Sequence, residues 1–168
     1  MMNKLTLLVR DEEGMTLVEL LAVIVILSIV AAIGGVAIAG VIQRSREDAR
    51  VADIQMLFEA ATLAESSDSF ISKGGGGTAG TAVTATQLHS KGYATSIAFL
   101  KNLSGTSTGD KAKFTLKAST ATDAAKLQLS LDGDATFAGS KGNVALTDLS
   151  TQQVKELTRT ELFNATTP

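Results

Sequence analysis

The sequence predicts an α+β fold in which one long N-terminal helix packs against a small antiparallel β-meander. Three observations predict it. An apolar run without a charged residue covers residues 20–42. Apolar residues then recur every three or four positions up to about residue 69, and every second position between residues 113 and 131. With 168 residues in all, one helix and one small head domain are expected.

The apolar run is long enough to span a membrane. A helix over residues 20–42 is roughly 35 Å long at about 1.5 Å per residue, whereas a hydrocarbon core is about 30 Å thick. The polar residues 1–14 precede the run, and basic residues flank it on both sides, so the positive-inside rule does not settle its orientation.

Glu19 lies one turn inside the start of the apolar helix. A carboxylate at such a depth costs a few kcal/mol and needs a partner or a function. The alternative is that Glu19 is solvated at the membrane interface and only marks the end of the helix.

The junction Gly14-Met15-Thr16-Leu17-Val18-Glu19, followed by the apolar run, resembles the processing site and first helix of type IV pilins and pseudopilins. An ordinary secretory signal has its apolar region before the cleavage point, whereas here the apolar run follows Gly14. The resemblance implies a pilin-like fold and a prepilin peptidase that cuts after Gly14 and methylates Met15. It also implies that Glu19 meets the amino terminus of a neighbouring subunit during assembly. Met15 departs from the family, which usually has phenylalanine there.

The same resemblance implies the partners and the location of the protein. The partners are other copies bound through their N-terminal helices, a prepilin peptidase and a pilus assembly platform, with the membrane as a reservoir. The protein is then a single-pass membrane protein before assembly and a cell-surface filament afterwards. The formal charge is −2 and the pI is about 5.4, so charge does not indicate DNA as a partner. The sequence has no cysteine, which excludes a disulfide framework.

Gly34 and Gly35 stand where most pilins have a proline. Each glycine lowers helix propensity by about 1 kcal/mol relative to alanine, so this point of the helix is softened. The glycines also suit close approach of neighbouring helices, and the two interpretations are compatible.

The second half of the helix has one apolar stripe that can pack against a sheet, formed by Ile54, Leu57, Phe58, Ala61 and Ala64. The charged neck before it, residues 44–50, is interpreted as a solvated segment with local ion pairs. A contact of this neck with lipid phosphate or a neighbouring subunit is the alternative. The sequence thus divides into a cleaved leader (1–14), a transmembrane and assembly helix (15–43), an amphipathic half-helix (44–70) and a head (71–168). From about residue 49 onward we expect a soluble unit.

The head pattern predicts a short helix over residues 86–93 that Gly92 stops, and strands around residues 113–118 and 126–131. Asp132-Gly133 predicts a hairpin turn from the second strand into residues 135–137. Val144 and Leu146 indicate a further strand. Residues 150–153 resemble a capping box that opens a final short helix through Val154 and Leu157.

No catalytic, cofactor or metal site is predicted, and the chain is not expected to be an enzyme. The pattern G-x-G-x-x-G at residues 75–80 follows a helix instead of a strand, and G-x-S-x-G at residues 105–109 has no histidine downstream. His89, the only histidine, has no second ligand at metal-site spacing. Asp132 and Asp134 are too few ligands for calcium and suit a turn. Sequons at Asn102 and Asn164 are interpreted as chance.

Three functions are compared. The first is a structural subunit of a type IV pilus filament used for adhesion, motility or DNA capture. The second is a pseudopilin of a competence DNA-uptake or type II secretion apparatus. The third, from another class, is a membrane-anchored binding domain that never polymerises. Gly14 and Glu19 separate the third from the others, because a simple anchor needs neither a cleavable glycine nor an intramembrane carboxylate.

Overall fold

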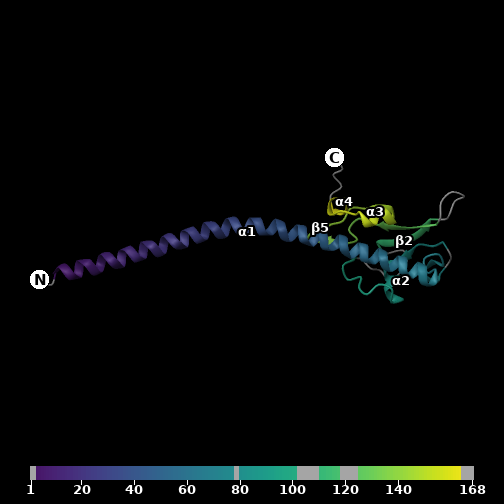
Figure 1. Cartoon of the computed structure of the whole chain (residues 1–168), viewed down its shortest axis with the longest axis horizontal. Coiled ribbons are helices and arrows are strands. Elements are labelled where there is room, and N and C mark those ends of the chain that lie inside the picture. Colours follow the sequence, from purple (N-terminus) through teal and green to yellow (C-terminus); the bar gives the residue numbers. More distant parts are fainter. Residues whose placement is uncertain (1–2, 78–79, 102–109, 118–124, 164–168) are drawn as a thin grey trace. The chain divides into compact units, whose positions relative to one another are not determined.

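The computed structural model describes residues 3–77, 80–101, 110–117 and 125–163, and their side chains from residue 16 onward. The chain separates into two compact units, Met1–Ile42 and Gln43–Pro168. Helix α1 (Asn3–Asp68) makes up the described part of the first unit and opens the second. Within the second unit, the remaining elements gather around the second half of α1, so the predicted α+β fold is confirmed (Figure 1).

The C-terminal end of α1 agrees with the sequence, but its beginning does not. Helix was expected from Met15 to about residue 69, and the structure ends it at Asp68 and begins it at Asn3. The leader is therefore helical as well. Residues 3–13 contain neither glycine nor proline and are rich in leucine and charged residues of high helix propensity, which explains the extension.

A left-handed residue and a carboxylate end α1. Ser69 has a φ of 50°, and its N–H still donates to the carbonyl oxygen of Glu65 at 2.9 Å. The Glu65 carboxylate accepts the backbone N–H of Ser72 at 2.9 Å and also its hydroxyl. The chain therefore turns back, and Phe70 and Ile71 become buried. A 3₁₀ turn, η1 (Gly74–Gly76), follows.

The predicted short helix is α2 (Ala85–Ser90), which follows the two-residue strand β1 (Val83–Thr84). Thr84 and Gln87 form a reciprocal capping box at its start. Gly92, at φ 84°, lies just beyond the end of α2, as the sequence predicts.

The sheet has the strand order β1-β2-β3-β6 and is antiparallel throughout. Strands β2 (Ala112–Lys117) and β3 (Lys126–Leu131) confirm the period of two. Phe114 pairs with Leu129, and both are fully buried, whereas alternate residues such as Thr115 and Gln128 are only partly covered. The sheet therefore has one apolar face.

The hairpin prediction at Asp132-Gly133 is wrong. Strand β3 pairs with β6 (Leu146–Ser150), while β4 (Phe137–Ala138) pairs only with β5 (Lys141–Gly142). The cause is Asn143, a buried side chain whose amide donates to the carbonyl oxygen of Asp132 at 3.1 Å and accepts the backbone N–H of Thr136 at 2.8 Å. These bonds hold residues 132–143 as a separate loop with its own small hairpin. Val144 precedes β6 and is not part of it.

The C-terminal capping box is confirmed at the start of α3 (Thr151–Lys155). The side chains of Ser150 and Gln153 each accept the backbone N–H of the other residue. The sequence interpretation placed Leu157 in this helix, but the helix ends at Lys155. An unpredicted helix, α4 (Arg159–Phe163), follows. Thr158 and Glu161 bond to each other across its first turn.

The core lies between the second half of α1, the sheet and the C-terminal helices. Every residue of the predicted stripe, from Ile54 to Ala64, is buried. Phe58 of this stripe meets Phe114 of β2 with a ring-centroid distance of 6.4 Å. Val154, Leu162 and Phe163 complete the core from α3 and α4.

Candidate processing and assembly segment

The processing junction is helical. Gly14 and Met15 belong to α1, although their side chains lie outside the described part of the chain. No element boundary separates residues 3–14 from the apolar run that follows them. A peptidase acting after Gly14 would therefore meet a helical backbone at this point.

The apolar side chains of α1 between residues 17 and 42 are exposed in the described part of the chain. Their exposed fractions range from 46% at Ile42 to 79% at Val36. The most apolar stretch of α1 has a mean hydropathy of 2.9, and none of it is buried. The segment is thus long and apolar enough to cross a membrane, and a core helix of a soluble head would be buried instead.

Glu19 is exposed on this apolar helix, with Leu17, Val18 and Leu20 around it in the sequence. Among the residues that the structure describes, Glu19 has no ion-pair partner. In lipid or among like helices, an isolated carboxylate is costly and is expected to pair or to serve a function. The pairing of Glu19 with the amino terminus of a second copy therefore stays a prediction.

The helix continues without interruption through Gly34 and Gly35. A β-carbon built on either glycine meets nothing within 4 Å. Neither glycine is therefore required by a contact that the described chain makes with itself. Softening of the helix or close approach of another helix remain the two interpretations.

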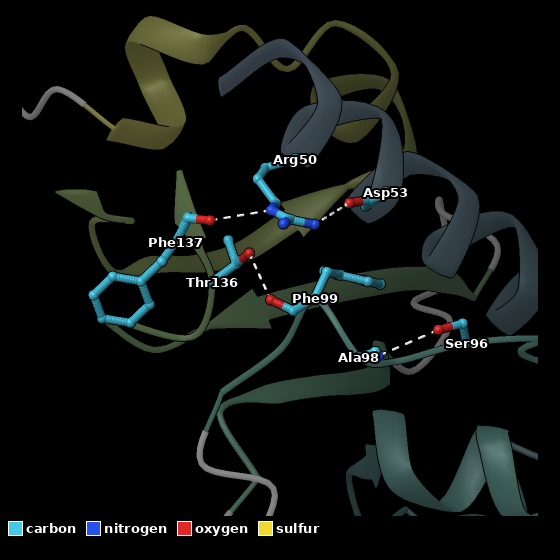
Figure 2. A network of polar contacts seen from close by, with 7 residues as sticks. All are labelled: Arg50, Asp53, Ser96, Ala98, Phe99, Thr136 and Phe137. Atoms are coloured by element: carbon cyan, nitrogen blue, oxygen red, sulfur yellow. Dashed lines mark hydrogen bonds and ion pairs between the residues drawn. The ribbon is translucent and has the colours of Figure 1, made fainter. Parts of the chain in front are cut away.

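Most of the charged neck is exposed, as its interpretation as a solvated segment predicts, but Glu47 and Arg50 also bond to the head. One local pair exists, between Arg50 Nη1 and Asp53 Oδ2 at 2.7 Å. Arg50 Nε also donates to the carbonyl oxygen of Phe137 in β4 at 3.0 Å (Figure 2). Gln43 Nε2 donates to the carbonyl oxygen of Ala138 at 2.9 Å.

An ion pair adds to these bonds. Lys141 Nζ of β5 lies 3.8 Å from Glu47 Oε1. Glu47 is buried, with an exposed fraction of 9%. We call this set of contacts from Gln43, Glu47 and Arg50 to the β4–β5 hairpin the neck clasp. Backbone carbonyl acceptors have no sequence signal, so the neck clasp could not be predicted from the residue types.

A groove of about 460 Å³ lies beside the neck clasp, between α1 and residues 93–99. Figure 2 shows a polar network beside the groove, in which Thr136 Oγ1 donates to the carbonyl oxygen of Phe99 at 2.9 Å. Tyr93 lines the groove and donates to the Asp68 carboxylate, a bond that raises the pKa of Tyr93. All these polar groups have partners within the head, so they hold the fold together.

The discounted chemical motifs have structural roles where the structure describes them. His89 Nδ1 donates to the carbonyl oxygen of Ala94 at 2.8 Å. Asp132 pairs with Lys113 at 3.8 Å, and Asp134 is a turn residue at φ 58°. In the described ranges, no three histidine or acidic side chains group as metal ligands would. The G-x-S-x-G pattern and both sequons lie outside the described residues, as do two positions of the glycine pattern at 75–80.

A family model described as the prokaryotic N-terminal methylation motif matches residues 9–35. The matched range contains Gly14, Met15, Glu19, Gly34 and Gly35, which are the residues that the sequence singled out. The match supports the pilin and pseudopilin family in general, and it does not distinguish a pilus from a competence or secretion filament. No curated protein and no solved structure matches the chain.

Proposed function

We propose that this chain, which carries the class III prepilin signal of type IV pilins and pseudopilins, is a structural subunit of a type IV pilus filament. The observation that carries the proposal is the coincidence of two features over one segment. The methylation motif covers residues 9–35, and the apolar helix within it is uncovered by its own chain.

The physical argument for assembly concerns this uncovered helix. Apolar surface of such extent is unstable in water and must be covered by lipid or by other apolar surface. A filament with apolar helices inside and heads outside covers it after the subunit leaves the membrane. The membrane is then the reservoir, and a pilus assembly platform transfers the subunit to the cell-surface filament.

The proposal assigns roles to the site residues. A prepilin peptidase cuts after Gly14, which removes the polar leader, and the new amino terminus on Met15 is methylated. The carboxylate of Glu19 compensates the terminal ammonium of an adjacent subunit, in surroundings where the attraction is stronger than in water. Gly34 and Gly35 allow the helix to bend or neighbouring helices to come close.

The experiment is electron microscopy of filaments sheared from the source cell, combined with the intact mass of their subunit. We expect surface filaments whose subunit begins at Met15 and carries one added methyl group. Gly14→Asp should block cleavage, whereas Gly14→Ala, the matched control, retains a small residue and should be processed. Assembled filaments whose subunits still begin at Met1 would contradict the proposal.

The same experiment separates the alternatives. A processed subunit in short structures confined to the envelope, without surface filaments, would indicate a pseudopilin of a competence or secretion apparatus. An unprocessed or processed subunit that stays monomeric in the membrane would indicate an anchored binding domain.

A further inference from the structure

Two exposed arginines follow the apolar run of α1 directly. Arg44 and Arg46 stand two and four residues after Ile42, and both are exposed. At about 1.5 Å per residue, their backbones are roughly 3 and 6 Å farther along the helix than Ile42. The headgroup layer on each side of a bilayer is about 5–8 Å thick, because a bilayer of about 40–45 Å contains a hydrocarbon core of about 30 Å. A helix whose apolar run fills the core therefore places both arginines among the headgroups.

The acidic side chains around these arginines are already paired with other cations. The pairs in the neck and in the helix turn after it have N–O distances of 2.7 to 3.8 Å: Glu47 with Lys141, Asp48 with Arg159, and Asp53 with Arg50. Among the residues that the structure describes, Arg44 and Arg46 have no ion-pair partner. The neck therefore keeps an excess of two positive charges where the head joins the apolar run.

The two arginines stand on opposite sides of α1, because residues two positions apart are separated by about 200° around a helix. The turn between β4 and β5 approaches one side: a β-carbon built on Gly139 would lie 3.4 Å from Arg46 Nη1. Arg44 stands on the other side. One docked protein helix covers one side of α1, whereas lipid headgroups surround a membrane helix on all sides. The arrangement therefore fits a lipid surface better than one protein partner.

We propose that Arg44 and Arg46 bind the headgroup phosphates of anionic lipids before the subunit is assembled. A guanidinium group donates two parallel N–H bonds to a phosphate, and each basic residue beside an anionic membrane surface strengthens the attraction about fivefold. The turn between β4 and β5 lies at the same level, since Gln43 donates to the carbonyl oxygen of Ala138. The lipid contact would thus hold the head at the membrane surface. The inference rests on the proposed function only for this reservoir stage.

The test uses the full chain in nanodiscs made of equal parts of phosphatidylglycerol and phosphatidylcholine. Native mass spectrometry counts the lipids of each kind that remain bound when the disc is removed. Arg44→Gln/Arg46→Gln removes both charges. The matched control, Lys73→Gln/Lys91→Gln, removes two charges from exposed lysines beside Asp68, the last residue of α1. Asp68 is roughly 33 Å along the helix from Arg46.

We expect the full chain to retain more phosphatidylglycerol than phosphatidylcholine. The ratio should fall at least about fivefold in Arg44→Gln/Arg46→Gln, and it should stay within about twofold in the lysine control. Arg44→Lys/Arg46→Lys, which keeps both charges, should retain most of the preference. Circular dichroism checks that the head is folded in every variant. An unchanged ratio in Arg44→Gln/Arg46→Gln, or an equal fall in the lysine control, would overturn the inference.

A second arm separates a lipid headgroup from free phosphate. Inorganic phosphate is added in large excess, and sodium chloride of equal ionic strength is added to a parallel sample. We expect the same preference for phosphatidylglycerol in both salts. A preference that disappears in phosphate but persists in chloride would overturn the inference and assign the two arginines to free phosphate.

Filament yield distinguishes this inference from the proposed function. If Arg44→Gln/Arg46→Gln lowers the yield of sheared filaments but leaves the lipid ratio unchanged, the inference is overturned and the arginines pair with acidic groups of another protein. The filament proposal would then remain intact. If the source cell carries no filaments but the lipid preference depends on the two arginines, the inference stands and the filament proposal fails.

Discussion

The two halves of α1 are built from similar apolar residues but have opposite relations to the rest of the chain. Leu27 in the first half has an exposed fraction of 60%, whereas Leu57 in the second half has 3%. The core face of the second half packs against the sheet of the head, whereas the apolar side chains of the first half are exposed. Both halves are therefore helical, and they differ in whether the head of the same chain buries their apolar side chains.

This difference separates two kinds of mutational effect. On the proposed function, a substitution in the first half should weaken contacts with lipid or with another copy, change assembly and leave the head folded. A substitution on the core face of the second half should unfold the head whether or not copies assemble.

The largest expected effect concerns Glu19. Glu19→Ala should leave membrane insertion and processing intact, because it removes a charge from an apolar helix. Filament yield should fall by tenfold or more, since the terminal ammonium of Met15 would be buried without a partner at a cost of several kcal/mol. The measurement is the ratio of sheared filaments to processed subunit in immunoblots.

The control for Glu19 is Glu19→Asp, which keeps the charge on a shorter side chain and should retain part of the assembly. Glu19→Ala filaments as abundant as those of the wild type would mean that Glu19 only marks the membrane interface. Assembly would then depend on the apolar helices alone.

A pair of leucine truncations compares the two halves directly. Leu57→Ala should lower the free energy of unfolding of the head by about 2–5 kcal/mol, because it leaves a cavity in a packed core. Leu27→Ala removes the same atoms from an exposed position and should leave head stability unchanged. Denaturant unfolding of the full chain in detergent micelles, followed through the head's circular dichroism, measures both. Similar losses for the two variants would contradict the separation of the halves.

The boundary between the halves can be tested by truncation. The sequence predicted a soluble unit from about residue 49, but the neck clasp includes Gln43 and Glu47. A fragment of residues 43–168 should therefore be more stable than one of residues 49–168 by about 1–2 kcal/mol, the value of the lost hydrogen bonds and ion pair. Thermal melts of the two fragments give the difference. Identical stabilities would show that the neck clasp contributes nothing to the head.

Much of this fold could be predicted because its signals are local. The period of the apolar residues gave the helix stripe at Ile54–Ala64 and the inward face of β2 and β3, and the capping box at Ser150 gave α3. The candidate site could also be identified, because Gly14, Glu19 and the apolar run are contiguous in the sequence. Helix α4 was not predicted, although Thr158 and Glu161 have the capping-box spacing that indicates the start of a helix.

The remainder depends on contacts between distant residues. The turn at Asp132-Gly133 has a strong hairpin composition, but the buried amide of Asn143 binds the carbonyl oxygen of Asp132 and redirects the chain. The neck clasp likewise depends on backbone carbonyl groups of β4. Any residue type supplies such a carbonyl, so no pattern of side chains indicates where it will lie.

The smallest expected effect is a pH dependence confined to the head. The Glu161 carboxylate accepts the backbone N–H of Thr158 at 2.8 Å and its hydroxyl at 2.8 Å, and these bonds lower the pKa of Glu161 in the folded state. Because the folded state binds the proton less tightly than the unfolded state does, the contribution to stability is present above the unfolded pKa of about 4.3 and is lost as the pH falls through the folded value.

Glu161→Gln should therefore weaken the acid dependence of the melting temperature of the 43–168 fragment between about pH 5 and about pH 3. It should leave the assembly of the full chain unchanged, since α4 belongs to the head. The Glu161 carboxylate is exposed, so the change in the acid dependence of the melting temperature should be small. If the melting temperature of Glu161→Gln falls as steeply with decreasing pH as that of the wild type, other carboxylates cause the acid sensitivity of the head.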